Sequence, residues 1–591
     1  MLILCGIPLA FMEMAVGQYT RQGPIGALSK LCPFFKGAGL ATVAISFLFT
    51  TYYIVIITWS FYYMFHTFSS ELPWTNCNHP WNSKLCRDGF SSPKSAAAHS
   101  AISGSGNITS TDYNLTSAIT NMAANLTSFN TIGDSNNQSD NVTLLTNESR
   151  SPTEDFFIEK VLQKSSGIEE QGSVRWELLL ILLMCWIIVY FCIWKGPKST
   201  GKVVYFTATC PYLVLIILLV RGITLPGSED GIDFFIKPRW SLLLDAKVWV
   251  NAAAQNFNSL GVAFGGLITM SSYSKFNNNI VRDVLILAVV DALTCLLAGF
   301  AIFAILGNLA LSQSKAVADV VEEGPGLVFV IYPQAFNTMP VSQLFAFLFF
   351  FMLVCLGIDS QFASVEVIVT TIQDHFGHAV RRWLKRKEIL VLIVCFVSFL
   401  AGLPNITQGG FYFFQLIDYY AAALSLMVLA FFEVIAICWF YGARNLAENI
   451  QHMTGSRPNI FFIICWYCIS PLLIFGIWIF SMIQYKPLSI AGYVYPPWAV
   501  GLGWVIALVS VLCIPAGMLH GILTTPGNSW RKRFRNSFKP NMRPGQSPPI
   551  LPDKDEANGL KADDIVLTNI VTSNNFSDQP YHKGSEDREY L

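Results

Sequence analysis

Several side chains that could bind ions lie inside long apolar runs of this sequence. One run contains the segment LGIDSQF, in which Asp359 is followed directly by Ser360. A carboxylate beside a hydroxyl offers the hard oxygen ligands that a small dehydrated cation prefers. A second run contains Asp291, with Cys295 about one helical turn further along. Because a charge in an apolar environment is costly without a partner, both carboxylates are candidates for a cation site. The alternative is that each polar group only holds helices together.

Residues 255–266, QNFNSLGVAFGG, are unusual in a different way. They place three glycines and three amide side chains within one stretch of an otherwise apolar run. Non-helical backbone is tolerated inside a membrane only where it lines a cavity or is buried in protein. The segment therefore predicts a helix broken near its middle, of the kind that presents backbone groups to ions and substrates. Close glycine packing between helices is the alternative.

The composition indicates that membrane helices hold these residues. Of the 591 residues, 53% are hydrophobic and 13% are charged, and the mean hydropathy is +0.47. Soluble proteins carry roughly 25% charged residues, so this chain could not cover several water-exposed domains. The net charge is zero, which argues against nucleic acid as a partner. No zinc spacing, phosphate loop or nucleophile elbow is present, and we expect no enzyme.

Ten runs are long enough to cross a bilayer, which takes about 20 apolar residues. They are 38–66, 176–194, 202–222, 247–273, 280–311, 342–373, 387–404, 408–440, 458–484 and 494–522. Residues 1–17 are also apolar but short, and they contain Glu13. This run has no basic start and no small-residue cleavage site, so we interpret it as the second half of a helix and not as a signal peptide.

Lys and Arg are concentrated in every second loop between these runs. Since cytoplasmic loops are rich in these residues, the pattern places the polar tail, 523–591, in the cytoplasm, where we expect it to be disordered. The same pattern places loop 67–172 outside the cell. This loop contains six N-x-S/T sequons, which predict a glycosylated segment. The sequons are at Asn107, Asn114, Asn125, Asn137, Asn141 and Asn147.

Two of the fourteen cysteines, Cys77 and Cys86, fall in that exterior loop. Because the exterior is oxidising, we predict a disulfide between them. The other cysteines lie mostly in the apolar runs, where a free cysteine behaves as a small hydrophobe. We assign those no function.

With these features, the chain resembles the sodium- and chloride-coupled neurotransmitter and amino-acid symporter family of leucine-transporter fold. The motifs that carry the resemblance are CGIPLAFMEMAVGQY, TYYIVIITWSFYYMF, the loop with the two cysteines, SSYSKFNNN, GPGLVFVIYP, LGIDSQF and FFQLIDYY. The resemblance implies an all-α membrane protein with two inverted five-helix repeats and two terminal helices. About 11 of 12 transmembrane helices would be present: part of the second in 1–17, the third in 38–66, and the fourth to twelfth in 176–522. The first helix, and with it part of each sodium site, would be missing from an incomplete gene model.

The resemblance also implies roles for individual residues. It assigns two sodium sites, a chloride site, a substrate pocket and two gates. The first sodium site would use Ser259 and Asp291, and the second would use Asp359, Ser360 and the carbonyl of Leu356. Chloride would bind at Gln255, Ser259 and Cys295, and the substrate pocket would be lined by Tyr53, Asn258, Leu260, Gly261, Phe264 and Ser364. Asp418 would form the outer gate and Asp374 the inner gate.

Three residues depart from the family pattern. Asp291 replaces the usual Asn and Cys295 the usual Ser. Because chloride is thought to balance the charge of bound sodium, a carboxylate there predicts weakened chloride dependence and looser cation selectivity. Asn258 stands where an aromatic residue usually covers the substrate, which predicts a wetter pocket.

We therefore expect a plasma-membrane symporter of invertebrate type that imports a small neutral amino acid or related neurotransmitter, such as glycine, proline or a GABA-like molecule, by alternating access. Its partners would be this substrate, sodium, chloride and membrane lipid; a homo-oligomer is left open. The alternatives are a non-transporting relative that acts as a scaffold or receptor, an inactive truncated isoform, and a passive channel. A channel has little support, since no run has a charged stripe.

Overall fold

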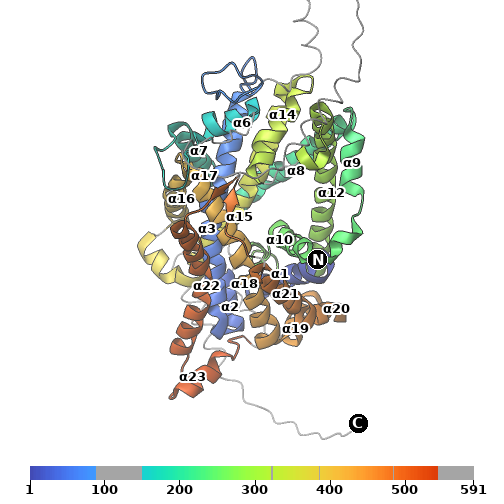
Figure 1. The fold of residues 1–591 in the computed structure, drawn as a ribbon. Helices are drawn as coiled ribbons and strands as arrows, with labels where there is room; N and C mark the ends of the chain where they lie inside the picture. Colours follow the sequence, from blue (N-terminus) through green and yellow to red (C-terminus); the bar gives the residue numbers. More distant parts are fainter. Residues whose placement is uncertain (88–149, 321–323, 385, 484, 491, 543–591) are drawn as a thin grey trace, which may run out of the picture.

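The computed structural model describes residues 1–87, 150–320, 324–384, 386–483, 485–490 and 492–542. The six predicted glycosylation sequons lie outside these residues. The described chain is almost entirely helical (Figure 1), and its one sheet is the two-stranded antiparallel pair β1 (Ser489–Ile490) and β2 (Tyr493–Val494). Within the described residues, ten helices are long and apolar enough to cross a membrane. The expected all-α polytopic membrane fold is confirmed.

These ten segments include the predicted runs except 247–273, and they include the short run at the start of the chain. That first run forms a helix that extends to Thr20. The segments are Leu2–Thr20 (with α1, Ile7–Thr20), Pro33–His66 (with α3, Lys36–His66), Trp176–Ile193 (α7), Thr200–Ile223 (in α8, Pro197–Ile223), Ile280–Gln313 (α12), Ser342–His375 (in α15, Ser342–Leu384), Lys387–Ile406 (with α16, Lys387–Gly402), Gly410–Thr454 (α17, Gly410–Ile417; α18, Leu426–Val434; α19, Ala443–Thr454), Ile460–Ile483 (α20, Ile460–Ile464; α21, Ser470–Ile483) and Pro497–Thr524 (α22).

Several of these segments contain π-helical or 3-10 stretches in place of regular α-helix. They are Leu2–Gly6, Pro33–Phe35, Leu403–Ile406, Asp418–Ser425, Ile435–Gly442 and Cys465–Ile469. Shorter elements join the long helices: α2 (Pro24–Leu31), α6 (Pro152–Asp155) with Phe156–Leu162, α9 (Ser228–Ile236), Trp240–Leu244, α13 (Val317–Val320), Leu327–Ile331, α14 (Tyr332–Asn337) and α23 (Trp530–Ser537).

The predicted broken helix is confirmed in segment 247–273. Helix α10 (Ala246–Leu260) ends at Gly261, and α11 (Gly266–Ser271) begins five residues later. Gly261, Ala263 and Gly265 have positive φ angles of 66°, 66° and 74°. Glycine adopts this conformation at little cost, whereas a residue with a Cβ does so rarely. A Cβ at Gly265 would also lie 2.6 Å from the Thr42 side chain, so the close approach of α3 requires glycine here.

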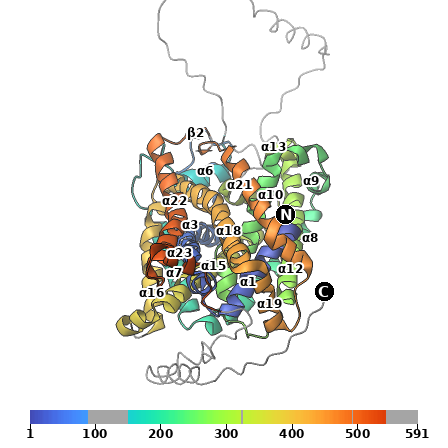
Figure 2. The ribbon, with the colours of Figure 1, turned by 90° about the horizontal axis from the view of Figure 1, so that it is seen from below.

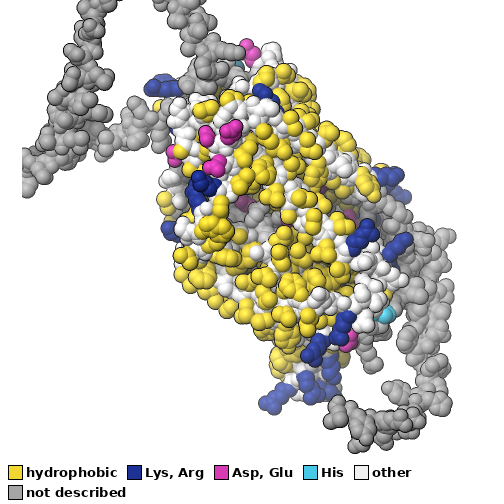
Figure 3. Space-filling model, turned by 90° about the vertical axis from the view of Figure 1, so that its right-hand side faces the viewer, with side chains coloured by type: hydrophobic (Ala, Val, Ile, Leu, Met, Phe, Trp, Pro, Cys, Tyr) yellow, Lys and Arg dark blue, Asp and Glu magenta, His cyan; other side chains and the backbone are white. Residues whose placement is uncertain are grey.

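Helix α3 occupies the interior and is packed against α7, α15, α16 and α22. Large aromatic side chains fill the space around it: Trp59 and Tyr63 are fully buried and contact the ring of Phe329. The N-terminal helix α1 is also mostly buried, and it lies beside α18 and α19 when the molecule is seen from below (Figure 2). Outward-facing apolar side chains cover much of the molecule's flank (Figure 3), as expected for a surface that contacts lipid.

The expectation of disorder from residue 523 onward is wrong for the first part of the tail. Helix α23 forms at Trp530–Ser537, and the chain is described as far as Met542. The physical reason is aromatic packing: the rings of Phe534 and Phe538 lie 5.8 and 4.4 Å from that of Phe34. Residues 543–591 lie outside the described part of the chain.

Candidate functional site

The break between α10 and α11 brings three predicted ion-binding side chains together. The Ser259 hydroxyl, on the last turn of α10, donates a hydrogen bond to the carboxylate of Asp291 on α12. The same hydroxyl oxygen lies 4.0 Å from the sulfur of Cys295, one turn further along α12. The predicted first sodium residues, Ser259 and Asp291, and the predicted chloride residue Cys295 therefore form one cluster. Among the described residues no hydrogen bond joins Gln255 to this cluster, although Gln255 lies on an exposed side of α10 one turn before Ser259.

The second predicted sodium site lies on a single face of α15. Leu356, Asp359 and Ser360 are three and four residues apart, so they share one side of the helix. The Ser360 hydroxyl donates to the Leu356 carbonyl over 3.4 Å. Asp359 Oδ1 accepts a 2.5 Å hydrogen bond from Thr207 Oγ1 on α8, a partner that sequence reasoning missed. This face thus combines a carboxylate, a hydroxyl and a backbone carbonyl.

An aromatic stack connects the broken helix to the second set of oxygen donors. Phe264, in the break, contacts the ring of Phe49 edge-on at 5.6 Å, and Phe49 stacks on Tyr53 at 4.5 Å. The Tyr53 hydroxyl interacts with the Ser360 side chain. Ser364 donates to the Ser360 carbonyl over 3.1 Å, so it lies one turn along the same helix. Four of the predicted site residues therefore lie along one continuous path from α3 to α15.

The remaining predicted pocket residues lie on the last turn of α10. Asn258 is exposed, and a Cβ added at Gly261 would meet no atom within 4 Å, so this turn borders open space. Leu260 differs, because its side chain is only 5% exposed. It packs toward Gly6 in the N-terminal helix and not toward that space.

The two predicted gate carboxylates have different kinds of partner. Asp418 interacts with the hydroxyl of Tyr52, which is next to Tyr53 in α3. Asp374 Oδ2 accepts a 2.8 Å hydrogen bond from the backbone N–H of Gly23, in the turn that leads into α2. Each carboxylate therefore links a later segment of the chain to the segment that contains α2 and α3.

The sequence matches the description "Sodium:neurotransmitter symporter family" over residues 1–525. The chain belongs to this family. It is similar to the sodium- and chloride-dependent GABA transporter ine of Drosophila melanogaster, with 47% identity over 92% of this chain and 53% of that protein. It is also similar to the sodium- and chloride-dependent GABA transporter 2 of Rattus norvegicus, with 42% identity over 91% of this chain and 82% of that protein. A third relative is the taurine transporter of Bos taurus, with 42% identity over 88% of this chain and 77% of that protein. The chain thus spans about half the length of the Drosophila relative.

This symporter-family chain contains a network that sequence reasoning missed, at the end of the broken helix. Glu366, 3% exposed on α15, accepts hydrogen bonds through Oε1 from Tyr273 Oη (2.8 Å) and Thr370 Oγ1 (3.1 Å). Lys387 Nζ, at the start of α16, forms an ion pair with the same oxygen at 3.2 Å. The network joins the chain after α11 to α15 and α16. The sequence signal for this network is the carboxylate of Glu366 inside an apolar run.

Two further carboxylates are buried among the helices of this family member. Glu13, on α1, has no exposed surface, and its Oε1 accepts a 2.7 Å hydrogen bond from the backbone N–H of Ala263 in the break. Glu433, on α18, is 2% exposed, and among the described residues neither of its oxygens has a hydrogen-bond partner. The two carboxyl groups interact electrostatically. Since ionisable groups inside membranes are functional candidates by default, both belong on the candidate list.

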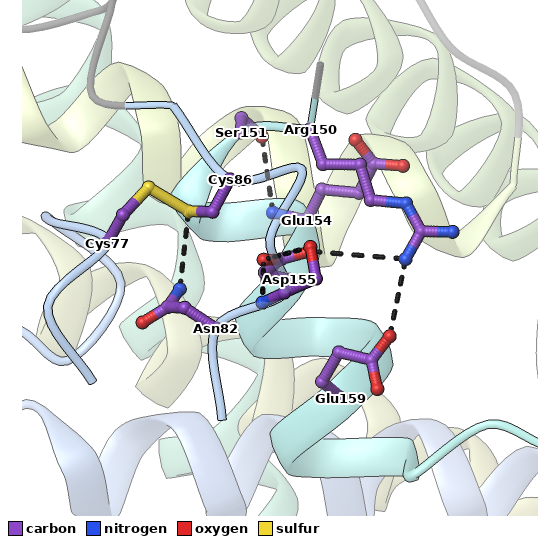
Figure 4. A network of polar contacts seen from close by, with 9 residues as sticks. Cys77, Asn82, Cys86, Arg150, Ser151, Glu154, Asp155 and Glu159 are labelled. Atoms are coloured by element: carbon purple, nitrogen blue, oxygen red, sulfur yellow. Dashed lines mark hydrogen bonds and ion pairs between the residues drawn. A yellow bond between two sulfur atoms is a disulfide. The ribbon is translucent and has the colours of Figure 1, made fainter. Parts of the chain in front are cut away.

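The predicted disulfide between Cys77 and Cys86 is present, with a Cα–Cα distance of 5.8 Å (Figure 4). Arg150 pairs through its backbone with the residues on either side of Cys86. Its guanidinium lies 4.0 Å from Asp155 and 3.2 Å from Glu159. These contacts hold together the two ends of the chain that flank residues 88–149.

Asp155 anchors this network beside the disulfide, because its side chain is fully buried and accepts hydrogen bonds from Ser83. The Ser83 backbone N–H donates over 2.8 Å and its hydroxyl over 2.9 Å. Nearby, burial lowers the pKa of Lys164, and the charge of Arg150 lowers it further. The Lys164 ammonium lies over the ring of Phe411 at 4.9 Å, a cation–π contact.

The site is built from oxygen donors in place of a His and Cys cluster. Within the described residues, no group of three or more His, Cys, Asp or Glu side chains could hold a metal ion. Sodium is a hard cation that binds hydroxyl, carbonyl and carboxylate oxygens. The donor sets around Asp291 and Asp359 have this chemistry; the first lies at the end of the broken helix α10, and the second lies between α15 and α8.

Proposed function

We propose that this chain is the membrane part of a sodium-coupled symporter that imports a small neutral amino acid or related neurotransmitter by alternating access. The observation that carries the proposal is the cluster of Ser259 and Asp291 at the break between α10 and α11. Broken helices at the centre of the membrane are where secondary transporters bind ions and substrate. The related sequences, sodium- and chloride-dependent GABA and taurine transporters, support the same function.

Sodium is a transported ion in this proposal, and we infer two sites. Ser259 and Asp291 would contact the first ion; Asp359, Ser360 and the Leu356 carbonyl would contact the second. Two sodium ions that move inward through about 100 mV release about 4.6 kcal/mol. This free energy is enough to concentrate a solute more than 10³-fold, since each 1.4 kcal/mol corresponds to about a factor of ten. No covalent step is needed, so the chain would not act as an enzyme.

The substrate in this proposal is a zwitterion of the GABA, taurine, glycine or proline type. Phe264 and Tyr53 would supply an apolar wall through their stack on Phe49. Asn258 and Gly261, on the exposed turn of α10, would supply a polar side chain and an accessible backbone. An amide at 258 hydrogen-bonds a carboxylate or sulfonate better than an aromatic ring does.

Chloride would bind weakly in this proposal. Gln255, Ser259 and Cys295 are the inferred chloride residues, and the carboxylate of Asp291 lies against Ser259. A fixed negative charge there both repels chloride and supplies the charge that chloride would otherwise provide. We therefore infer a weaker chloride dependence than a neutral residue at 291 would give.

The proposed location is the plasma membrane, with the loop that contains Cys77 outside and the tail in the cytoplasm. Ten apolar helices and the family support a multi-pass membrane protein. The alternation of basic loops supports the orientation. A second candidate function, a non-transporting receptor or scaffold, is favoured by the unusual residues Asn258 and Asp291.

Uptake measurements distinguish the two functions. Cells that express the full chain are given radiolabelled GABA, taurine, glycine or proline in sodium or in choline buffer. A symporter accumulates at least one substrate in sodium only, and Asp359→Asn abolishes this uptake while surface expression is unchanged. Ser312→Ala, on a serine that bonds only its own helix, serves as the control. Equal retention in both buffers by surface-expressed protein would support the scaffold function.

A further inference from the structure

Helix α23 is fixed against the body of the molecule. Its aromatic residues pack on the loop before α3: the rings of Phe534 and Phe538 lie 5.8 and 4.4 Å from Phe34, and Phe538 also stacks on Phe440 at 5.1 Å. After the helix, the backbone N–H of Asn541 donates to the Lys30 carbonyl over 2.8 Å. The helix therefore has a defined position below the end of α22 (Figure 1).

The exposed surface of α23 presents cations. Arg531, Lys532 and Arg535 are exposed, and so is Lys539, two residues after the helix ends. Among the residues that the structure describes, none of these four side chains forms an ion pair. Figure 3 shows Lys and Arg side chains gathered at this lower end of the molecule. Four close cations without counter-charges repel one another, so the surface favours an anionic partner.

Exposed aromatic surface lies beside these cations. Trp530 is 54% exposed and Phe534 is 44% exposed, and the two share a face because they are one helical turn apart. Leu519 and Leu523, on the last turns of α22, are each 53% exposed, so the outward apolar surface continues to seven residues before Trp530. A tryptophan next to basic residues at the end of such a surface is typical of a helix that lies in the membrane interface.

We propose that α23 is a binding site for anionic phospholipid headgroups of the cytoplasmic leaflet. Arg531, Lys532, Arg535 and Lys539 contact the headgroups, and Trp530 inserts at the level of the glycerol backbone. Charge complementarity decides in favour of lipid, since the cytoplasmic leaflet is the anionic surface nearest to the end of α22. The inference rests on the proposed orientation of the tail. Because the helix packs on Phe34 beside α3, bound lipid would stabilise the cytoplasmic ends of both α3 and α22.

Hydrogen–deuterium exchange in nanodiscs tests this proposal with the full chain. The protein is placed in discs of phosphatidylcholine alone or with one third phosphatidylserine. We expect the backbone amides of residues 530–537 to exchange at least roughly tenfold more slowly with phosphatidylserine, because several basic residues contribute together. High salt removes the difference, since it screens the attraction. Both leaflets of a disc have the same composition, so the result does not depend on the orientation or on transport.

Two triple variants, each of which removes three positive charges, serve as the test and its control. Arg531→Gln, Lys532→Gln and Arg535→Gln together abolish the phosphatidylserine effect. Lys237→Gln, Arg239→Gln and Lys315→Gln remove three exposed cations near α9 and α13 and leave the effect unchanged. Trp530→Ala reduces it.

Equal exchange of α23 in the two kinds of disc would overturn the proposal, and so would an effect that both triple variants retain. Stronger protection by soluble polyglutamate in phosphatidylcholine discs than by phosphatidylserine would assign the surface to an acidic protein instead. Loss of sodium-dependent uptake with the lipid effect intact would contradict the proposed function alone.

Discussion

The carboxylate of Glu13 accepts a 2.7 Å hydrogen bond from the backbone N–H of Ala263, at the centre of the broken helix. Ala263 has a φ angle of 66°, a conformation that costs a residue with a Cβ about 1 kcal/mol or more. Helix α1 therefore supplies the acceptor that the missing helical hydrogen bond would have provided. The break is stabilised from both sides, because Ser46 on α3 donates to the carbonyl of the next residue, Phe264, over 2.7 Å.

Replacement of Glu13 by Leu is expected to destabilise the protein. The Ala263 N–H would be left without an acceptor in the apolar interior, which costs about 1–3 kcal/mol. Glu13→Gln is the matched control, since its amide oxygen still accepts the hydrogen bond and one of two interacting carboxylates is removed. Thermal unfolding of the purified protein measures both variants. The argument fails if the midpoint temperatures of the Leu and Gln variants are equal.

Replacement of Thr207 by Val is expected to raise the apparent affinity for sodium. Thr207 Oγ1 hydrogen-bonds Asp359 Oδ1, and an ion that binds this carboxylate must compete with that donor. A hydrogen bond to a charged group contributes about 1.5–3 kcal/mol, so its loss would lower the half-saturating sodium concentration by roughly tenfold. Sodium-dependent thermal stabilisation measures this without a transport assay. Thr207→Ser keeps the hydroxyl and should behave as the natural protein; a higher half-saturating concentration in the Val variant would refute the competition.

The break between α10 and α11 could be predicted because glycine and amide residues are concentrated at 255–266. Thr207 could not, because a lone threonine in an apolar helix usually bonds its own backbone, as Thr207 also does to Val203. Glu366 and Glu433 carry the same sequence signal as Asp291 and Asp359, a carboxylate within an apolar run. The contacts that the sequence could not predict are those between residues that lie far apart in the chain.

Helix α23 is the clearest case of such a long-range effect. Its sequence, WRKRFRNS, is strongly charged, and this composition favours disorder when it is considered alone. The aromatic residues that order it are few, and their partner Phe34 is about five hundred residues earlier in the chain. The same applies to Tyr273, whose partner Glu366 lies on another helix.

Replacement of Asp155 by Ala is expected to loosen the chain around the Cys77–Cys86 disulfide. The change leaves the Ser83 N–H and the Arg150 guanidinium without this acceptor, at a cost of about 1–3 kcal/mol. Glu159→Gln is the control, because Glu159 is 39% exposed and its ion pair with Arg150 contributes at most about 1 kcal/mol. Unfolding temperature and surface expression should fall for Asp155→Ala only. Similar losses in both variants would show that Arg150, and not the buried carboxylate, organises the loop.

Replacement of Asp291 by Asn is expected to make transport depend more strongly on chloride. In the natural protein the carboxylate of Asp291 hydrogen-bonds Ser259 next to Cys295, so a negative charge is already present at the inferred chloride position. Asn keeps an oxygen acceptor for Ser259 but removes the charge, and chloride is then needed to balance the sodium ion. We expect gluconate substitution to reduce uptake by roughly tenfold in Asp291→Asn, a change of about 1.4 kcal/mol, and much less in the natural protein. Cys295→Ser adds a hydroxyl without a change in charge, so its chloride dependence should lie close to that of the natural protein. Strict chloride dependence of uptake by the natural protein would contradict the role assigned to Asp291, because it would show that the carboxylate does not replace the anion.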